Sequence, residues 1–494
     1  MKRLLLGVVA ITICAAGLYG YAAARRERTF RQLIDRGDAA LAKDDTFSAI
    51  ESFSGAIMLK GDSMLGYLKR GQAYRRRQQL DAPAHGSHQA VKLDPAADAA
   101  IRDLRRAAEL DPLSPRPLEL LGDVNYALLR YDRAAEAYQK YIQLDDRSPR
   151  ILYKLALSHY SAQRPDPAVA ALQKAVAIDD RFAEAYYLLG LCYRDLHKRD
   201  SALRALQTSV ALAPAMIHAR EELADLYGRL KPDARIAQLE ALASLDPGPR
   251  RRVALGLAYV RAGEFDRAIN TLGRAAEQYP DHPYTYVALG RVWLEKAQPR
   301  GDRVDLSKAL GALQDAVGSD DSSEALTLFG RALLLSKSVD LAETVLQQAT
   351  EKMPVDPQAY YYLADAAERR GHSDVALGAL LDFRALEGDD PDNRRRAAMF
   401  GRLGDLSVQQ RKPGDGVAWY QRAIEANGAD APLLVRLAQA QLLSGSPATA
   451  IATLQKALDK DPFNRDALAL ARRMKLPSAP SSDPRGPGAH PQGS

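Results

Sequence analysis

Residues 182–214 read FAEAYYLLGLCYRDLHKRDSALRALQTSVALAP, and the spacing of their small residues predicts the fold of the chain. Gly190 lies in an apolar stretch, Ala202 stands twelve positions further on, and Pro214 closes the segment. In segments of this kind the apolar residues recur in steps of three and four, which is typical of helices rather than strands. The segment therefore predicts two helices, one on each side of a turn.

The same spacing recurs along almost the whole chain. A small residue, most often preceded by leucine, marks the first half of each segment: Gly37, Gly71, Gly122, Ala156, Gly190, Ala224, Gly256, Gly290, Gly330, Ala364, Gly404 and Ala438. Seven of the eleven intervals between these residues are equal, at 34 positions, and alanine follows most of the small residues twelve positions later. Self-similarity at a fixed period of this length indicates a repeat protein.

Small residues at these positions let the two helices of a segment approach each other closely. A large side chain there would overpack the contact, which typically costs about 1–3 kcal/mol. Proline after the second helix stops that helix, because proline cannot continue it. A single pair of helices leaves one apolar face uncovered, and the neighbouring pair buries that face by stacking on it.

With these landmarks the chain resembles the tetratricopeptide repeat (TPR) family over residues 30–475. The segments most similar to that family are 182–214 and 249–280, the second of which carries Gly256, Ala268 and Pro280. The resemblance implies an all-α fold: a right-handed α-solenoid of about twelve TPR helix pairs, ended by a capping helix at 465–475. It says little about the partner, because the matched residues hold helices together.

The repeat spacing also divides the chain into parts. Residues 1–29 precede the predicted superhelix of residues 30–475, and the tail, 476–494, is rich in Pro, Gly and Ser and predicted to be disordered. A loop insertion is predicted at about 80–96, with shorter additions near 298–304 and 387–393. The segment around Ala224 is two residues short, and Gly416 stands where alanine is expected.

The N-terminal segment carries an uncharged run, residues 4–24, between Lys2 and Arg3 on one side and Arg25 and Arg26 on the other. Its 21 residues would span about 30 Å as a helix, so we expect a single-pass anchor in the inner (cell) membrane. A signal peptide cleaved after Ala24 is the alternative. The basic residues favour a cytoplasmic body slightly over a periplasmic one.

Composition excludes several classes of function. The chain has 68 Lys+Arg and 62 Asp+Glu among its 494 residues, and this scattered charge makes nucleic-acid binding unlikely. Two cysteines cannot build a disulfide framework or a cysteine-based metal site. The sequence contains no glycine-rich phosphate loop and no hydrolase or metalloprotease motif, so we expect neither an enzyme nor a cofactor.

The remaining side chains that could act in catalysis or bind a metal have simpler structural explanations. His85 and His88 form a close pair in the predicted loop, where nothing supplies a rigid third metal ligand. Cys192 lies among apolar neighbours and is expected to be a buried structural thiol. Arginine triplets at 75–77, 250–252 and 394–396 fall at helix ends or beside loops, where charge usually faces solvent.

In TPR proteins the first helix of each pair lines a concave groove that binds peptides, so the resemblance directs attention there. The position one residue after each packing residue is expected to face the groove, and so are the positions three or four residues before and after it. Seven side chains at such positions should therefore face the groove: Tyr153, Tyr160, Tyr187, Arg194, Arg291, Arg331 and Tyr361. Exposed tyrosine and arginine are enriched at interfaces, although tyrosines at these positions can also pack between repeats. The lysine and asparagines with which chaperone-binding relatives hold a C-terminal carboxylate are absent.

The sequence predicts a membrane-tethered scaffold or adaptor that binds proteins or peptides and assembles or regulates a bacterial envelope complex. Its layout is similar to that of the family that regulates lipopolysaccharide assembly, without the cysteine module of that family. RNA binding by related helical repeats is one alternative. A non-catalytic accessory subunit of a separate enzyme is another. The sequence does not set the oligomeric state.

Overall fold

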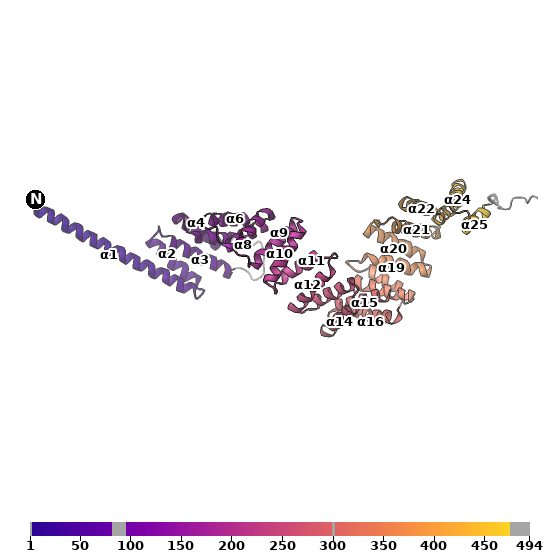
Figure 1. The fold of residues 1–494 in the computed structure, drawn as a ribbon, viewed down its shortest axis with the longest axis horizontal. Helices are drawn as coiled ribbons and strands as arrows, with labels where there is room; N and C mark the ends of the chain where they lie inside the picture. The colour runs from indigo at the N-terminus through magenta and orange to yellow at the C-terminus, as the bar shows by residue number, and fades with distance from the viewer. Residues whose placement is uncertain (1, 82–94, 299–301, 475–494) are drawn as a thin grey trace, which may run out of the picture. The chain divides into compact units, whose positions relative to one another are not determined.

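The computed structural model describes residues 2–81, 95–298 and 302–474, with side chains over 13–77, 95–298 and 302–474. These residues form 25 helices and no strand, and Figure 1 follows them from α1 to α25. Twelve consecutive pairs are followed by one single helix, so the predicted α-solenoid with a capping helix is confirmed. The chain divides into two compact units, residues 1–245 and 246–494.

The first unit contains the first six helix pairs. Their bounds are α1 Lys2–Leu41, α2 Thr46–Leu59, α3 Met64–Asp81, α4 Pro95–Leu110, α5 Pro115–Ala127, α6 Tyr131–Leu144, α7 Pro149–Ser161, α8 Pro165–Ile178, α9 Ala183–Asp195, α10 Arg199–Leu212, α11 Ile217–Tyr227 and α12 Pro232–Leu245.

The second unit contains the other six pairs and the capping helix. Their bounds are α13 Pro249–Arg261, α14 Phe265–Gln278, α15 Pro283–Ala297, α16 Arg303–Ser319, α17 Ser323–Leu335, α18 Val339–Thr350, α19 Pro357–Arg370, α20 Ser373–Glu387, α21 Asn393–Gln409, α22 Pro413–Asn427, α23 Ala431–Leu443, α24 Pro447–Lys460 and α25 Arg465–Arg473.

In six repeats the small residue is a glycine that packs directly on a large residue of the second helix, 16 positions later. A Cβ on Gly122 would lie 2.4 Å from the ring of Tyr138, and one on Gly190 would lie 2.5 Å from Leu206. The alanine twelve positions after the small residue is buried as well, as at Ala134. The two backbones of a pair therefore approach too closely for a side chain at the small position, as the sequence predicts.

Two insertions lengthen this spacing without changing the contact. Gly71 faces Leu104, 33 positions later, and Gly290 faces Leu313, 23 positions later. The longer intervals fall between α3 and α4 and between α15 and α16. Residues 82–94, with most of the predicted insertion at about 80–96, and residues 299–301 lie outside the described part of the chain. The histidine pair at 85 and 88 and the predicted tail lie outside it as well.

The turn between the helices of a pair is held by one left-handed residue, seven positions after the small residue. Gly263, Gly371 and Gly445 take this conformation, with φ between 79° and 81°. Larger residues take it in other pairs, for example Leu129 at φ 58° and His197 at φ 57°. Because the left-handed region is costly for residues with a Cβ, packing on both sides of the turn must hold it there.

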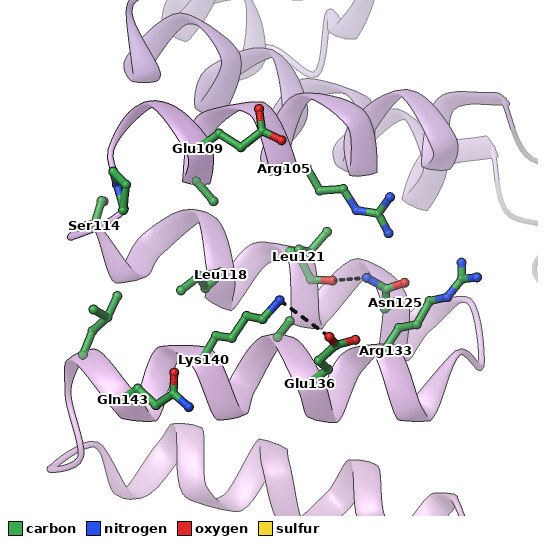
Figure 2. A pocket seen from close by; sticks show the side chains of 14 residues that line it. Arg105, Glu109, Ser114, Leu118, Leu121, Asn125, Arg133, Glu136, Lys140 and Gln143 are labelled. Carbon is green, nitrogen blue, oxygen red and sulfur yellow. Dashed lines mark hydrogen bonds and ion pairs between the residues drawn. The ribbon is translucent and has the colours of Figure 1, made fainter.

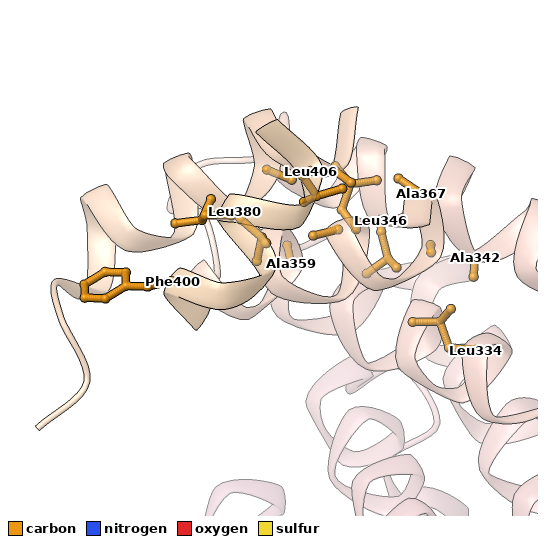
Figure 3. Close-up of a cluster of buried hydrophobic side chains, with 14 of the residues drawn as sticks. Leu334, Ala342, Leu346, Ala359, Ala367, Leu380, Phe400 and Leu406 are labelled. Atoms are coloured by element: carbon orange, nitrogen blue, oxygen red, sulfur yellow. The ribbon is translucent and has the colours of Figure 1, made fainter. Parts of the chain in front are cut away.

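The core consists of consecutive hydrophobic clusters rather than one central mass. The cluster drawn in Figure 3 belongs to the second unit and runs from Leu326 to Ala440, with Leu346, Leu380 and Leu403 fully buried. In the first unit α1 adds Phe30 and Ile34 to the first cluster. Each pair thus covers the apolar face of its neighbour, as stacking requires.

The departures from the repeat also fit this packing. Ile236, twelve positions after Ala224, is 5% exposed and takes the place of the expected alanine. At Gly416 a Cβ would meet Val408 at 2.7 Å, so the helices of this pair approach more closely than alanine would allow.

The apolar run at 4–24 forms part of α1, which continues without a break to Leu41. Across the described ranges, none of the helices is both long enough and apolar enough to pass through a membrane. The structure thus gives no support to the predicted anchor.

Candidate protein-binding surface

The first helices of neighbouring pairs form one layer of each unit and contact each other along it. In the first unit α3 contacts α5 and α7 contacts α9; in the second, α13 contacts α15, α15 contacts α17, and α17 contacts α19. In a curved stack of two layers, the helices that touch one another lie on the inner side. Side chains that project from this layer therefore form a continuous surface within each unit.

Four of the predicted groove residues lie in the first unit, on α7 and α9. The hydroxyl of Tyr160 accepts a hydrogen bond from Arg194 Nη2 at 3.4 Å, and Arg194 Nη1 donates to Glu222 at 2.6 Å. Burial, followed by the contact with Asp195, raises the pKa of Tyr160 to about 12. These side chains form a chain of polar contacts across three successive first helices.

Tyr153 and Tyr187 are also half-buried. The ring of Tyr153 packs against Phe182 with centroids 5.2 Å apart, and Tyr153 belongs to the edge of a hydrophobic cluster. Burial raises the pKa of Tyr187, and the negative charge of Glu222 raises it further. Both tyrosines thus contribute to packing between repeats, and their role in binding stays a prediction.

The other three predicted residues lie in the second unit, so the structure forms two sets, one in each unit. Arg291 is hydrogen-bonded to Glu324. Arg331 donates to Gln298 at 2.9 Å. Tyr361 lies under the guanidinium of Arg402, 5.3 Å from the ring centroid to Cζ.

An acidic cluster that the sequence analysis missed lies in the inner layer of the first unit. Lys154 Nζ donates to Glu119 at 2.9 Å and to Asp123 at 2.7 Å, while the hydroxyl of Tyr138 donates to Asp123 at 2.8 Å. Burial disfavours the charged form of Glu119, but Lys154 and Arg116 outweigh it and the pKa of Glu119 falls below its ordinary value. The cluster is thus an ionised network inside the stack.

The same arrangement occurs in the second unit at the same spacing. The hydroxyl of Tyr420 donates to Asp405 at 2.6 Å, and Arg436 Nη1 donates to Asp405 at 2.9 Å. In both networks the tyrosine follows the aspartate by 15 positions and the cation follows it by 31. The sequence does carry this signal, because each aspartate directly follows a packing glycine.

A third copy of the spacing lies near the N-terminus, where Asp38 pairs with Lys69 at 2.8 Å. Phenylalanine takes the tyrosine position there, at Phe53. The aspartate and the cation thus pair across successive first helices in all three copies, with or without the hydroxyl group.

The arginine triplets and the buried cysteine have structural roles. In each triplet at least one arginine is engaged within the chain: Arg75 pairs with Asp123 at 3.2 Å, Arg252 lies over the ring of Tyr279, and Arg396 donates to the carbonyl of Asp390 at 3.0 Å. Cys192 is fully buried, as predicted, and burial raises its pKa to about 12. A thiol that stays protonated at neutral pH is a poor nucleophile.

Comparison with protein families gives three matching family models. One model described as "Tetratricopeptide repeat" matches residues 97–149, 327–394 and 402–465, and a second with the same description matches 249–292. A model described as "Anaphase-promoting complex, cyclosome, subunit 3" matches residues 127–209. Together the matches fall in both units.

Among curated proteins, the chain is similar to tetratricopeptide repeat protein 21B of Mus musculus, with 24% identity, covering 46% of this chain and 19% of that protein. It is also similar to TPR repeat-containing protein YpiA of Bacillus subtilis, with 25% identity, covering 41% of this chain and 45% of that protein. The chain thus spans less than half the length of either relative.

Among solved structures, the chain is similar to the APC/C hetero-tetramer Cut9-Hcn1 and to YrrB, described as a TPR protein with an unusual peptide-binding site. The first has 15% identity and a TM-score of 0.35 and covers 90% of this chain and 96% of that chain. The second has 18% identity and a TM-score of 0.33 and covers 40% of this chain and 94% of that chain.

Proposed function

Because the chain is a tetratricopeptide repeat protein, we propose that it is a scaffold or adaptor that binds other proteins or peptides through the inner layer of first helices. The observation that carries this proposal is the row of partly exposed tyrosine and arginine side chains on successive first helices of the second unit. Its members are Arg291, Arg331, Tyr361, Arg402 and Arg436. These two residue types are enriched at protein interfaces and dominate their binding energy.

The ion pairs of this row suggest how a partner would bind. The side chain of Arg402 is 28% exposed and bonds to Glu368, and that of Arg436 is 42% exposed and bonds to Asp405. A guanidinium has five donors, so each arginine can bind a carboxylate of the partner while it keeps its present one. The half-buried ring of Tyr361 offers apolar area beside them. An extended acidic peptide with apolar residues fits this surface.

Site-specific photo-crosslinking in the full chain tests this proposal. A photoreactive amino acid at Tyr361, on the inner layer, should form crosslinked products that the same residue at Arg274, exposed on a second helix, does not. Replacing Arg402 and Arg436 with glutamate should abolish the products at position 361 by repelling an acidic partner. Equal products at both positions, or products that survive the charge reversal, would contradict binding through the inner layer.

A second part of the proposal is the place where the scaffold works. The apolar side chains of α1 that precede the first core cluster are exposed: Ile13 by 66%, Leu18 by 70% and Tyr19 by 79%. An uncovered apolar helix next to arginines is suited to association with a membrane. We propose that this segment tethers the scaffold to the inner membrane of a bacterial cell, with its body in the cytoplasm and an envelope complex as its partner.

Deleting residues 2–24 tests the tether and leaves Phe30 and Ile34 in their core cluster. The full chain should sediment with membranes, and the shortened chain should move to the supernatant with its helical circular dichroism unchanged. If both proteins distribute alike, the tether is wrong, whereas the crosslinking result for the inner layer still stands.

A further inference from the structure

A groove on the opposite layer of the first unit has an unusual composition. It lies between the second helices α4 and α6, with α5 as its floor, and has a volume of about 600 Å³. Figure 2 shows Leu118, Leu121 and Asn125 along the floor, with Arg105 on one wall and Arg133 on the other. None of the predicted inner-layer residues lines it, so it is a separate surface.

Asn125 leaves an unmet hydrogen-bonding group at this groove. Its side chain is only 2% exposed, and its Nδ2 donates to the carbonyl of Leu121 at 2.7 Å. Its Oδ1 is buried and finds no hydrogen-bond partner within the described part of the chain. A buried acceptor without a donor costs about 1–3 kcal/mol, so a ligand that donates to Oδ1 would recover part of that cost.

Two later repeats carry tyrosine at the position of Asn125 and show how it is bonded there. Tyr193 and Tyr227 stand at the position of Asn125, two and three repeats later. The hydroxyl of Tyr193 accepts from Gln173 at 3.1 Å, and that of Tyr227 accepts from Gln207 at 2.8 Å. Each glutamine precedes its tyrosine by 20 positions, on the second helix of the preceding pair.

Arg105 precedes Asn125 by the same 20 positions. The groove at α4 and α6 thus has a donor where glutamine stands in those two repeats, but it lacks the phenol ring that the donor would bind. Asparagine is much shorter than tyrosine, so this repeat does not supply the ring itself. The groove beside it, with a volume of about 600 Å³, has room for a phenol group from another molecule.

The charges around the groove favour an acidic ligand. Its two carboxylates have cationic partners: Glu136 pairs with Lys140 at 3.6 Å, and Glu109 pairs with Arg106 at 3.0 Å. Arg105 and Arg133 are exposed, and neither makes a hydrogen bond or an ion pair with the residues that the structure describes. Two guanidinium groups in this state can bind the carboxylates that flank an inserted ring.

We propose that this outer groove binds a tyrosine side chain in an acidic segment of a partner protein. The phenol oxygen accepts a hydrogen bond from Arg105, as Tyr193 and Tyr227 accept from glutamine. The phenol hydroxyl donates to Asn125 Oδ1 and satisfies it. Acidic residues next to the tyrosine pair with Arg133 and with the remaining donors of Arg105. The scaffold thus has a second binding surface, on its outer layer.

The test measures binding of a fluorescein-labelled pentapeptide, with tyrosine at its centre and two glutamates on each side, to the full chain by fluorescence anisotropy. A second peptide with phenylalanine at the centre should bind at least about tenfold more weakly, because it can neither donate to Asn125 nor accept from Arg105. Equal affinities for the two peptides would show that charge alone attracts them and would overturn the proposal. Absence of binding at millimolar peptide would overturn it as well.

Asn125→Tyr supplies the missing ring from the chain itself and should abolish binding of the tyrosine peptide while the melting temperature holds or rises. His159→Tyr makes the same change one repeat later and is the matched control, which should leave binding unchanged. Arg105→Met with Arg133→Met, at two exposed positions, removes both the donor to the phenol and the charges that pair with the flanking carboxylates, and should weaken binding at least about tenfold without unfolding the chain. Unchanged binding by Asn125→Tyr or by the arginine variant would refute the groove as the site.

Discussion

The two acid–tyrosine–cation networks share their spacing but differ in how open they are. In the first unit Lys154 lies between two carboxylates, and its side chain is 18% exposed. In the second unit Arg436 has one carboxylate, and its guanidinium lies 3.6 Å from where a Cβ on Gly401 would stand. Glu119 holds the position of Gly401 in the first network. One residue thus decides whether the cation is enclosed or available to a partner.

Comparison of the two networks indicates that the same repeat position can stabilise the fold in one unit and be available for binding in the other. A second carboxylate satisfies the cation of the first network, so that network has little left to offer a ligand. Glycine in its place leaves the donors of Arg436 open to solvent. Mutations at equivalent positions should therefore have unequal effects.

The largest difference is expected for removal of the cation. Lys154→Met removes the cation that Glu119 and Asp123 share but leaves them paired with Arg116 and Arg75, so it should lower the free energy of local opening at α5–α7 by about 2 kcal/mol, less than the full cost of breaking a buried ion pair. Arg436→Met should cost less than about 1 kcal/mol at α21–α23, because exposed pairs contribute little. Hydrogen exchange read by mass spectrometry measures both. Equal costs would mean that the two networks do not differ as described.

The packing beneath the networks should show no such difference. Gly122→Ala and Gly404→Ala place a Cβ 2.4 Å and 2.5 Å from the rings of Tyr138 and Tyr420, so each should cost about 2 kcal/mol by overpacking. Gly311→Ala is the control, because nothing lies within 4 Å of its Cβ. It should stabilise its helix by about 0.5–1 kcal/mol, since alanine favours helix over glycine. Urea unfolding followed by circular dichroism ranks the three variants.

Removing the tyrosine hydroxyl should have a smaller effect. Tyr138→Phe removes one hydrogen bond to Asp123 and should cost about 1 kcal/mol, and Tyr420→Phe should cost about half of that because Asp405 is the more exposed carboxylate. Phe53 shows that the repeat tolerates phenylalanine here. The same unfolding measurement applies. A cost above about 2 kcal/mol for either variant exceeds what one hydrogen bond contributes and would contradict the assignment.

The smallest of these effects is expected from acid, which should reduce the contribution of the first network to the stability of the protein. The folded pKa of Glu119 lies below its ordinary value of 4.5, so its stabilising contribution is present above that pH and is lost as the pH falls through the folded pKa. The urea midpoint of the wild type should therefore fall more between pH 6 and pH 3 than that of Glu119→Gln, whose side chain does not titrate. If the urea midpoints of the two proteins fall by the same amount, the charge of Glu119 does not contribute to the stability of the fold.

Much of the architecture could be predicted from the sequence, because it depends on short, regular spacings. The small residues marked twelve helix pairs, and their altered intervals predicted where residues are added. The residue that packs on most of the glycines, 16 positions later, was missed because leucine, phenylalanine and tyrosine share that position. The left-handed turn residue was missed because leucine and histidine occupy it as well as glycine.

The candidate surfaces were less predictable. The periodicity placed Tyr153 and Tyr361 on the inner layer, but it could not tell how far neighbouring repeats would cover them. The constant spacing between aspartate and cation is readable once one pair has been seen in space. The outer groove required the structure, because the buried Oδ1 of Asn125 without a partner, and the glutamine–tyrosine hydrogen bonds of two other repeats, are seen only there.

The main helix contacts of the described residues join elements that lie one or two places apart along the chain. Each pair therefore needs only its predecessor in order to dock, and it can do so while the chain is still leaving the ribosome. Closing contacts over such short distances is fast, which limits the time that apolar faces stay uncovered during synthesis. Under a pulling force the same neighbour-only contacts would yield one pair at a time, so the protein would lengthen in small steps as a molecular spring.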